Sequence, residues 1–463
     1  MRQLVGSIRD DTSVRAFLIT LAAPPLRKAA AKLADAERVV AERPNDTDAA
    51  LKYAEALGSW GDAGGYDAEV FWDTCLTEAF GVDLSEVGER PVATLSGGEQ
   101  KRLALEVLLR GTDDVLLLDE PDNFLDIPAK RRLEDQLRAT NKTILYVSHD
   151  RELLAATATK VVTLEASGAW THGASFATYY EARDARRERI EDEHARHMRE
   201  RDRLEAIMKE MKRRAAFADN FAPKAKAAES RLRHFDEAGP PPEQVRDKKI
   251  AVRLGGARTG KRAVMLEQLE LDGLTDPFDA ELWFGERVAV VGSNGTGKSH
   301  FLHLLAGRAI DHHGDWRLGA NVVPGFFSQT HDHPELAGRT LVDILASRDQ
   351  PRGAAMSRLR RYELQGCADQ PFETLSGGQQ ARFQVLLLEL DGATLLLLDE
   401  PTDNLDLASA EALEDGLTEF EGTVIAVTHD RWFMRGFDRF LVFGDDCKVS
   451  DHLEPPAEVF GVR

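Results

Sequence analysis

The sequence predicts an α/β protein made of two copies of one module, the first lacking its beginning, joined by an α-helical hairpin. Three observations support this. A glycine-rich loop at 292–299 follows a short apolar run and precedes a helical pattern. Three motifs recur at a constant separation of 280 positions, and a long charged segment with helical periodicity separates the two copies.

The loop at 292–299 has the spacing G-x-x-x-x-G-K-S, which is typical of a loop that wraps around phosphate groups. Its glycines let backbone N–H groups point inward, Lys298 supplies charge to the β and γ phosphates, and Ser299 supplies a hydroxyl to Mg²⁺. An unrelated glycine-rich turn is the alternative, which the preceding strand pattern and the following helix pattern disfavour. The expected nucleotide-binding residues here are Gly292, Ser293, Asn294, Gly295, Thr296, Gly297, Lys298 and Ser299.

Length and composition limit the remaining choices. The chain has 463 residues, of which 43% are hydrophobic, so it can form two or three domains. The net charge of −20 means that any contact with nucleic acid must be local. Three widely separated cysteines form neither a metal-binding spacing nor a disulfide framework, which suits a reducing cytoplasm. No apolar run approaches the length of a membrane span.

The repeat consists of a serine-glycine-glycine motif, an apolar strand that ends in Asp-Glu-Pro, and a histidine after the next strand. Ser96 and Ser376, Glu120 and Glu400, and His149 and His429 are each 280 positions apart. Strands of this kind deliver carboxylates to the carboxyl edge of a sheet, where α/β proteins bind ligands. Any one of these motifs alone would indicate only a helix cap or a core histidine. Their occurrence together, in this order and after a phosphate loop, is specific.

These motifs resemble those of the ATP-binding cassette family. The resemblance implies that two cassettes pair head to tail, with each ATP held between the loop of one and the Ser-Gly-Gly motif of the other. Asp399 would join Ser299 and Gln329 in holding Mg²⁺, Glu400 would polarise the attacking water, and His429 would contact the γ-phosphate. The counterparts Glu120 and His149 would act in the first cassette. The expected motif residues facing nucleotide are Ser96, Gly97, Gly98, Ser376, Gly377 and Gly378.

The first copy is incomplete, because no G-x-x-x-x-G-K-[ST] motif precedes residue 95. Gln329 occupies the position of the family's conserved loop glutamine in the second copy, and the sequence after Gln3 echoes the sequence after Gln329. We interpret Gln3 as the equivalent glutamine, and a frayed terminus is the alternative. On this interpretation about 65 residues are missing upstream, from a truncation or an internal start, judging by the second copy. An in-frame loop motif upstream would support this, and a stop codon there would oppose it.

Two helical additions are expected. An insertion at about 24–65 contains an alanine-rich helix pattern and a second helix around 46–57, which predicts a helical arm, and a plain surface elaboration is the alternative. The segment 179–240 predicts two antiparallel helices that a break at 218–223 separates. The expected domains are therefore 1–178, 179–240 and 241–463.

Near the expected tip of this hairpin, eight basic residues outnumber Glu210, Asp219 and Glu229. This local reversal of charge favours an RNA backbone as partner, and a solvated charged hairpin is the alternative. The basic residues are Lys209, Lys212, Arg213, Arg214, Lys224, Lys226, Arg231 and Arg233.

The tandem cassettes, linker hairpin and arm resemble the ATP-binding cassette F family. The resemblance implies a cytoplasmic, Mg²⁺-dependent ATPase that acts on the ribosome, through rRNA or tRNA, in translation or antibiotic protection. Two departures concern the subgroup: the run after each strand glutamate keeps Leu-Asp but not the usual histidine, and His300 replaces a common threonine. The ATPase subunit of a membrane transporter is the alternative, and it would have no use for a basic helical hairpin.

Overall fold

The computed structural model describes residues 10–165, 168–240, 250, 252–256, 258–328, 333, 335–403 and 405–456. It contains two compact units, one formed by Met1–Leu153 together with Ile250–Arg463 and the other by Leu154–Lys249. The first unit therefore holds the motifs of both copies, and the second holds the charged segment. Gln3 and Gln329 lie outside the described residues.

The second copy, here called the second module, is built on parallel strands. Its strands are β5 (Arg262–Leu271), β6 (Phe278–Trp283), β7 (Arg287–Gly292), β8 (His312–Leu318), β9 (Pro324–Phe327), β10 (Leu395–Asp399), β11 (Thr423–Val427), β12 (Arg439–Phe443) and β13 (Val449–His452). Six of them form a sheet in the order β13-β12-β7-β11-β10-β9, and three form an antiparallel sheet in the order β6-β5-β8. Only β13 runs antiparallel within the six-stranded sheet. The predicted strand before the phosphate loop is confirmed as β7.

The central strands of this sheet are buried on both faces, as expected for parallel strands in an α/β fold. Helix α11 (Lys298–Leu305) shares one apolar core with the antiparallel sheet and with one face of β7, β10, β11 and β12. The opposite core contains the remaining helices, which are α12 (Leu341–Ala346), α13 (Arg352–Arg361), α14 (Gly377–Asp391) and α15 (Leu407–Glu419). This layering brings the carboxyl ends of β7, β10 and β11 together at one edge.

Among the described residues, the parallel sheet of the first module consists of two strands. Its elements after the arm are α6 (Gly97–Arg110), β1 (Val115–Asp119), α7 (Ile127–Ala139), β2 (Thr143–Val147) and α8 (Arg151–Thr157). Strands β1 and β2 pair in the same register as β10 and β11, since Val115 faces Thr143 as Leu395 faces Thr423. One face of this pair packs against α6, α7 and α8. The other face is exposed, and Leu117 retains 62% of its accessible surface.

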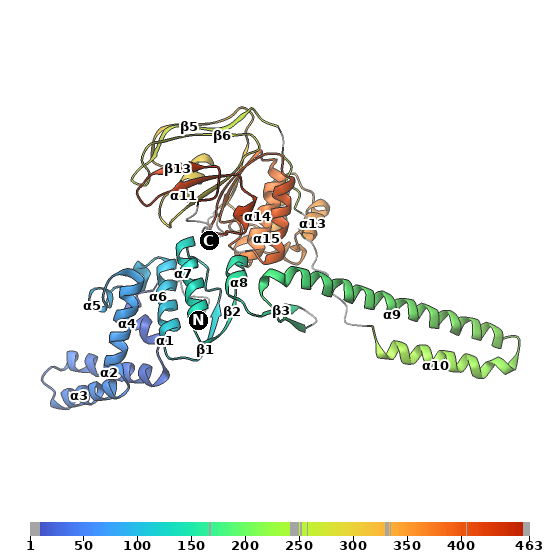
Figure 1. Cartoon of the computed structure of the whole chain (residues 1–463), viewed down its shortest axis with the longest axis horizontal. Coiled ribbons are helices and arrows are strands. Elements are labelled where there is room, and N and C mark those ends of the chain that lie inside the picture. Colours follow the sequence, from blue (N-terminus) through green and yellow to red (C-terminus); the bar gives the residue numbers. More distant parts are fainter. Residues whose placement is uncertain are drawn as a thin grey trace. The chain divides into compact units, whose positions relative to one another are not determined.

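Two helices lie in the insertion predicted at about 24–65, namely α2 (Pro24–Glu42) and α3 (Thr47–Asp62). The helices on either side of it are α1 (Val14–Leu21), α4 (Gly65–Phe80) and α5 (Leu84–Val87). The side chain of Asp46 caps α3, and α2 and α3 lie side by side (Figure 1). Helix α3 ends at Asp62, within the glycine-rich stretch 61–65, and its last turn carries Trp60, which is buried against Trp72 with ring centroids 6.4 Å apart. Packing of the two rings therefore stabilises the last turn of the helix.

The second unit contains the predicted helical hairpin. Strands β3 (Val161–Glu165) and β4 (Gly168–His172) precede α9 (Tyr179–Ala215), a short 3₁₀ turn η3 (Asp219–Phe221) and α10 (Ala222–Ala238). Helices α9 and α10 lie side by side (Figure 1). The helical conformation is interrupted where predicted, with a proline in the first turn of α10. The apolar side chains on α9 are only partly buried, since Leu204 is 6% exposed but Ile207 is 40% exposed.

Stacked aromatic rings hold the base of α9. Tyr179 stacks on Trp170 and on Phe176, with centroid distances of 5.7 and 5.2 Å. The Tyr179 hydroxyl also lies 3.0 Å from the hydroxyl of Thr163 on β3. The β3–β4 hairpin and the start of α9 thus share one aromatic cluster. Across the described residues, no helix has both the length and the apolar character that a membrane span requires.

Candidate functional site

The phosphate loop has a backbone that only glycine accommodates easily. Gly292, Gly295 and Gly297 have φ angles of 149°, 88° and 96°. A Cβ atom at position 292 would lie 2.2 Å from the carbonyl oxygen of Phe443. The loop therefore turns directly from β7 into α11, which places the amino end of α11 at the carboxyl edge of the sheet.

Lys298 and Ser299 begin α11, where the loop holds their side chains. The Lys298 ammonium, on a residue only 6% exposed, donates to the carbonyl oxygens of Gly292 at 2.9 Å and Ser293 at 2.6 Å. Burial lowers the pKa of Lys298, and Glu400 opposes that shift most strongly. The Ser299 hydroxyl donates to Asp399 Oδ1 at 3.2 Å. The sheet thus joins the loop to the carboxylate strand, as the motifs predicted.

Glu400 and His429 form a buried pair at the same edge. Glu400 Oε2 accepts a hydrogen bond from the His429 backbone N–H at 3.0 Å, and Glu400 Oε1 lies 3.5 Å from His429 Nε2. Burial, together with Asp403 and Asp399, raises the pKa of Glu400 well above its usual value. Burial lowers the pKa of His429 well below its usual value, so the ring is neutral near pH 7. Glu400 has a φ of 46°, a strained conformation typical of functional positions.

The adjacent hydroxyl and carboxylate of Ser299 and Asp399 fit a Mg²⁺ ion, which prefers a few oxygen ligands and retains water. Burial raises the pKa of Asp399, and the Ser299 hydroxyl and Lys298 oppose that shift. The third predicted ligand, Gln329, lies outside the described residues.

The first module contributes its Ser-Gly-Gly motif to the same region. Ser96 caps α6 in a reciprocal pair with Glu99, in which the backbone N–H of each residue donates to the side chain of the other, and this fixes the start of the helix at Gly97. The Asn294 side-chain amide donates to the carbonyl oxygen of Phe124 at 3.4 Å. A Cβ atom at Gly98 would lie 3.8 Å from that amide and 2.6 Å from the Phe124 oxygen. The loop of the second module and the motif of the first therefore meet.

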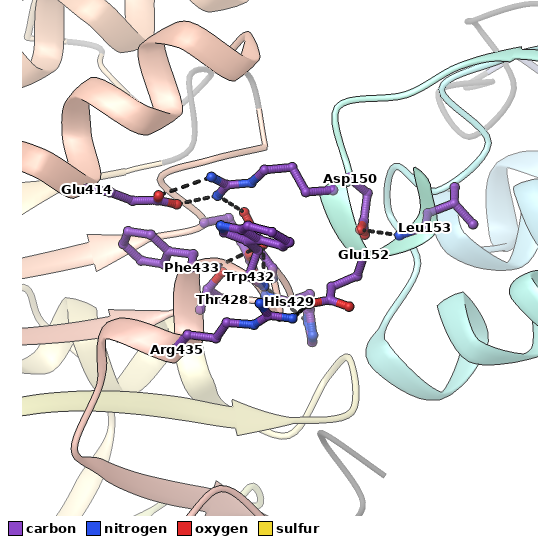
Figure 2. A network of polar contacts seen from close by, with 12 residues as sticks. Asp150, Glu152, Leu153, Glu414, Thr428, His429, Trp432, Phe433 and Arg435 are labelled. Carbon is purple, nitrogen blue, oxygen red and sulfur yellow. Dashed lines mark hydrogen bonds and ion pairs between the residues drawn. The ribbon is translucent and has the colours of Figure 1, made fainter. Parts of the chain in front are cut away.

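Ion pairs extend this contact between the modules. Arg151 forms a two-pronged pair with Glu414, and Arg431 pairs with Glu134. These pairs are related by the 280-position repeat, so the interface has an internal two-fold character. Figure 2 shows Glu414 and Arg435 of the second module facing residues 150–153 of the first, with Arg435 paired to Glu152. Ile127, the first residue of α7, also lies within the apolar core of the second module.

The corresponding residues of the first module are arranged in the same way but are more open. His149 Nε2 lies 3.6 Å from Glu120 Oε1, and the histidine side chain is 43% exposed, against 10% for His429. Glu120 has a φ of 43°, close to that of Glu400, and follows Asp119 at the end of β1. Ser376, Gly377 and Gly378 cap α14 as their counterparts cap α6. Among the described residues, no hydrogen bond links these three to the first module.

Two buried lysines of the first module were missed from the sequence. Lys101 on α6 is 1% exposed and donates to the carbonyl oxygen of Glu120. Lys130 on α7 is 7% exposed and forms an ion pair with Asp150. The repeat places Ala381 and Ala410 at the equivalent positions. A comparison of the two copies for differences, as well as for matches, would have singled out both lysines.

Comparisons with known proteins agree with these motifs. The family model described as ABC transporter matches residues 275–403. The chain is 51% identical to an "Antibiotic resistance protein" of Mycobacteroides abscessus over 98% of this chain and 87% of that protein. It is 31% identical to "ABC transporter F family member 2" of Arabidopsis thaliana over 80% of this chain and 55% of that protein. The chain thus spans little more than half of the plant relative.

The solved structures give a likeness in fold. The structure titled "RNase-L Inhibitor" matches with a TM-score of 0.52 and 21% identity, covering 80% of this chain and 67% of that one. At this level of identity the likeness concerns the α/β architecture alone.

Proposed function

Because this chain belongs to the ATP-binding cassette F family, we propose that it binds ATP between its two modules and hydrolyses it to ADP and phosphate. The observation that carries this proposal is the contact of Asn294 in the phosphate loop with Phe124 beside the Ser-Gly-Gly motif of the other module. A nucleotide held by Lys298 would then be covered by Ser96, Gly97 and Gly98.

Each residue at this edge has a role that its environment supports. The loop N–H groups and Lys298 bind the phosphates, while Glu400 orients the attacking water and accepts its proton. Lys298 and the His429 N–H lower the pKa of Glu400, which favours the base form that burial opposes. Neutral His429 donates or accepts a hydrogen bond at the γ-phosphate without adding charge. When bound by Ser299, Asp399 and Gln329, Mg²⁺ supplies charge neutralisation to the phosphates.

The first module forms a second, unequal site. Asp119, Glu120 and His149 would face Ser376, Gly377 and Gly378 there, but the side chains of Glu120 and His149 are more exposed than those of Glu400 and His429. Water-exposed groups interact with charge less strongly than enclosed ones. We therefore assign ATP turnover to Glu400 and His429, and a minor role to their counterparts in the first module.

A direct test replaces the two strand glutamates separately. We expect Glu400→Gln to lower kcat by roughly 100-fold or more while ATP still binds, because the site loses its proton acceptor. The matched variant Glu120→Gln should change kcat less than about twofold, because it removes a carboxylate from the more exposed site and leaves Glu400 in place. Steady-state phosphate release and equilibrium binding of ATP measure both quantities. Wild-type turnover in Glu400→Gln would remove this residue from the mechanism.

We also propose that the protein acts on the ribosome in the cytoplasm, in translation or in protection from antibiotics. The relative at 51% identity carries the name "Antibiotic resistance protein". Five of the eight basic residues near the hairpin tip pair with nearby glutamates, as Lys212 does with Glu229 at 2.7 Å. Lys224, Lys226 and Arg231 form no ion pair among the described residues and remain for phosphate groups. Phe217, 88% exposed near the tip, can stack on a base.

Co-sedimentation distinguishes this role from that of a transporter subunit. We expect Glu400→Gln, which retains ATP, to sediment with ribosomes when ATP is present, and Lys224→Glu/Lys226→Glu in the same background to lose this binding. Charge reversal at Lys209 and Lys212, which already have glutamate partners, is the matched control and should weaken binding less. Co-purification with a membrane permease and no binding to ribosomes would favour the transporter alternative.

A further inference from the structure

Lys130 reaches the proposed hydrolytic site from the opposite module. It lies on α7, yet its ammonium donates to the backbone carbonyl oxygen of His429 at 3.3 Å. The N–H of the same residue, His429, donates to Glu400 at 3.0 Å. A single residue of the second module therefore connects Lys130 with the carboxylate that we assign as the base.

The surroundings of Lys130 explain why a buried cation is stable there. Its ammonium lies 3.0 Å from Asp150 Oδ2, and both side chains are less than a tenth exposed. Burial alone would lower the pKa of Lys130, but Asp150, followed by Asp122, Asp403 and Asp430, raises it above its usual value. Lys130 therefore stays charged and offsets the repulsion between aspartates of both modules.

The repeat shows that this arrangement serves one site only. Position 410, the equivalent of Lys130, is a buried alanine, which has no group that could reach His149. The two histidines also differ in exposure, since the His429 side chain is 10% exposed and the His149 side chain is 43% exposed. The two copies share their arginine–glutamate pairs, so the lysine is a difference between them and not a general property of the interface.

We propose that Lys130 is a positioning residue, which fixes the His429 backbone from the other module so that Glu400 is correctly oriented only when the modules are in contact. This proposal rests on the hydrolytic role assigned to Glu400. It adds a connection between contact of the two modules and the geometry of one site. The connection is made by a lysine that belongs to none of the motifs.

The first test compares Lys130→Met with Lys142→Met. Lys142 is a matched control because its ammonium also donates to backbone carbonyls, those of Leu108 at 3.0 Å and Gly111 at 2.6 Å, but within the first module. We expect Lys130→Met to lower kcat roughly 10- to 100-fold with KM for ATP changed less than about twofold, because displacement of a base affects the chemical step most. Lys142→Met should leave kcat within about twofold of wild type. Equal losses in both would overturn the proposal.

The second test moves the lysine between the copies. The double variant Lys130→Ala/Ala410→Lys moves the cation to the position that the repeat relates to residue 130, where Asp430 and Asp150 exchange places, and directs it toward His149 in place of His429. We expect its melting temperature to approach that of wild type while kcat stays low. Full recovery of kcat would show that charge at the interface suffices, and would overturn the positioning role. Lys130→Arg, which keeps the charge and a donor at the original position, should retain more activity than Lys130→Met if both fold.

Amide hydrogen exchange tests the proposal without a measurement of ATP turnover. We expect exchange at the His429 N–H to become at least about tenfold faster in Lys130→Met, because the N–H···Glu400 bond loses its support, with Val427 unchanged. If wild-type protein proves to hydrolyse no ATP, the proposed function fails, and this measurement still decides the positioning role. Unchanged protection of His429 in Lys130→Met would overturn it.

Discussion

Strands β1 and β2 of the first module and strands β10 and β11 of the second have the same sequence pattern, pairing register and following motifs, but different surroundings. Leu397 and Ile425 are fully buried against α11 and the antiparallel sheet. Their counterparts Leu117 and Leu145 are 62% and 59% exposed, since no element in the described part of the chain covers that face. The comparison shows that an apolar run fixes the strand and its register, whereas burial depends on elements elsewhere in the chain.

The glutamates that follow β1 and β10 differ in burial in the same way as the strands. Glu400 is 7% exposed as a side chain and Glu120 is 18% exposed, although both have the same strained backbone conformation. The conformation at the carboxyl end of the strand therefore belongs to the local motif. The burial that raises the pKa of Glu400 depends on the elements packed around the strand.

The largest expected effect concerns the covered and uncovered leucines. Leu397→Ala should lower the free energy of unfolding by about 2–5 kcal/mol, because it leaves a cavity in a closed core. The matched variant Leu117→Ala should lower it by less than about 0.5 kcal/mol. Thermal and urea denaturation of both variants measure the difference. A similar loss in the two would mean that the β1–β2 face is covered in solution, and the comparison would no longer hold.

A smaller, pH-dependent effect concerns Lys101, which stands where the second module has Ala381. Burial lowers the pKa of Lys101 from its ordinary 10.5 to about 8. Between these pH values the folded protein holds fewer protons at this site than the unfolded protein, so the free energy of unfolding rises with pH. Below pH 8 the charged, buried lysine destabilises the fold, and this cost disappears toward pH 10.5.

The measurement is the difference in free energy of unfolding between Lys101→Met and wild type. We expect the stability of the variant relative to wild type to fall by roughly 2–3 kcal/mol between pH 7.5 and 10.5. Lys209→Met, which removes a lysine whose side chain is 69% exposed, should show no such trend. A difference for Lys101→Met that stays constant with pH would contradict the lowered pKa.

The smallest effect tests the part of the interface that the two copies share. Double-mutant cycles should give coupling energies of about 1–2 kcal/mol for Arg431–Glu134 and for Arg151–Glu414, because at least one partner of each pair is buried. Arg435–Glu152, whose arginine side chain is 53% exposed and which has no counterpart in the repeat, should give less than about 1 kcal/mol. If the coupling energies of the first two pairs differed from each other by more than the coupling energy of the third pair, the interface would not follow the repeat.

The sequence predicted those parts of the fold that depend on local pattern. The strand before residue 292, the helices of the arm and of the linker hairpin, and the break near Pro223 are all observed. Helix α3, expected around 46–57, extends to Asp62, and the contact of Trp60 with Trp72 that stabilises its last turn could not be predicted from a local pattern. The hairpin charge was counted correctly, but the pairing of Lys212 on α9 with Glu229 on α10 appears only in three dimensions.

The candidate site was predictable where a motif holds several of its members. The loop, Asp399, Glu400 and His429 lie together as expected, and Asn294 meets the first module beside Gly98. Lys130 was not predictable from a motif, because its role arises from packing between segments about 300 residues apart. Gln3 and Gln329 stay predictions, as do the domain boundaries and the roles of individual side chains.

The 37 residues of α9 give the molecule a long lever. At 1.5 Å per residue this helix spans about 55 Å, so a tilt of about 10° at its first turn would swing the opposite end through roughly 10 Å. The stacked rings of Trp170, Phe176 and Tyr179 stiffen the pivot. Angular adjustments too slight to break a hydrogen bond near that pivot would thus be amplified into movements larger than a side chain.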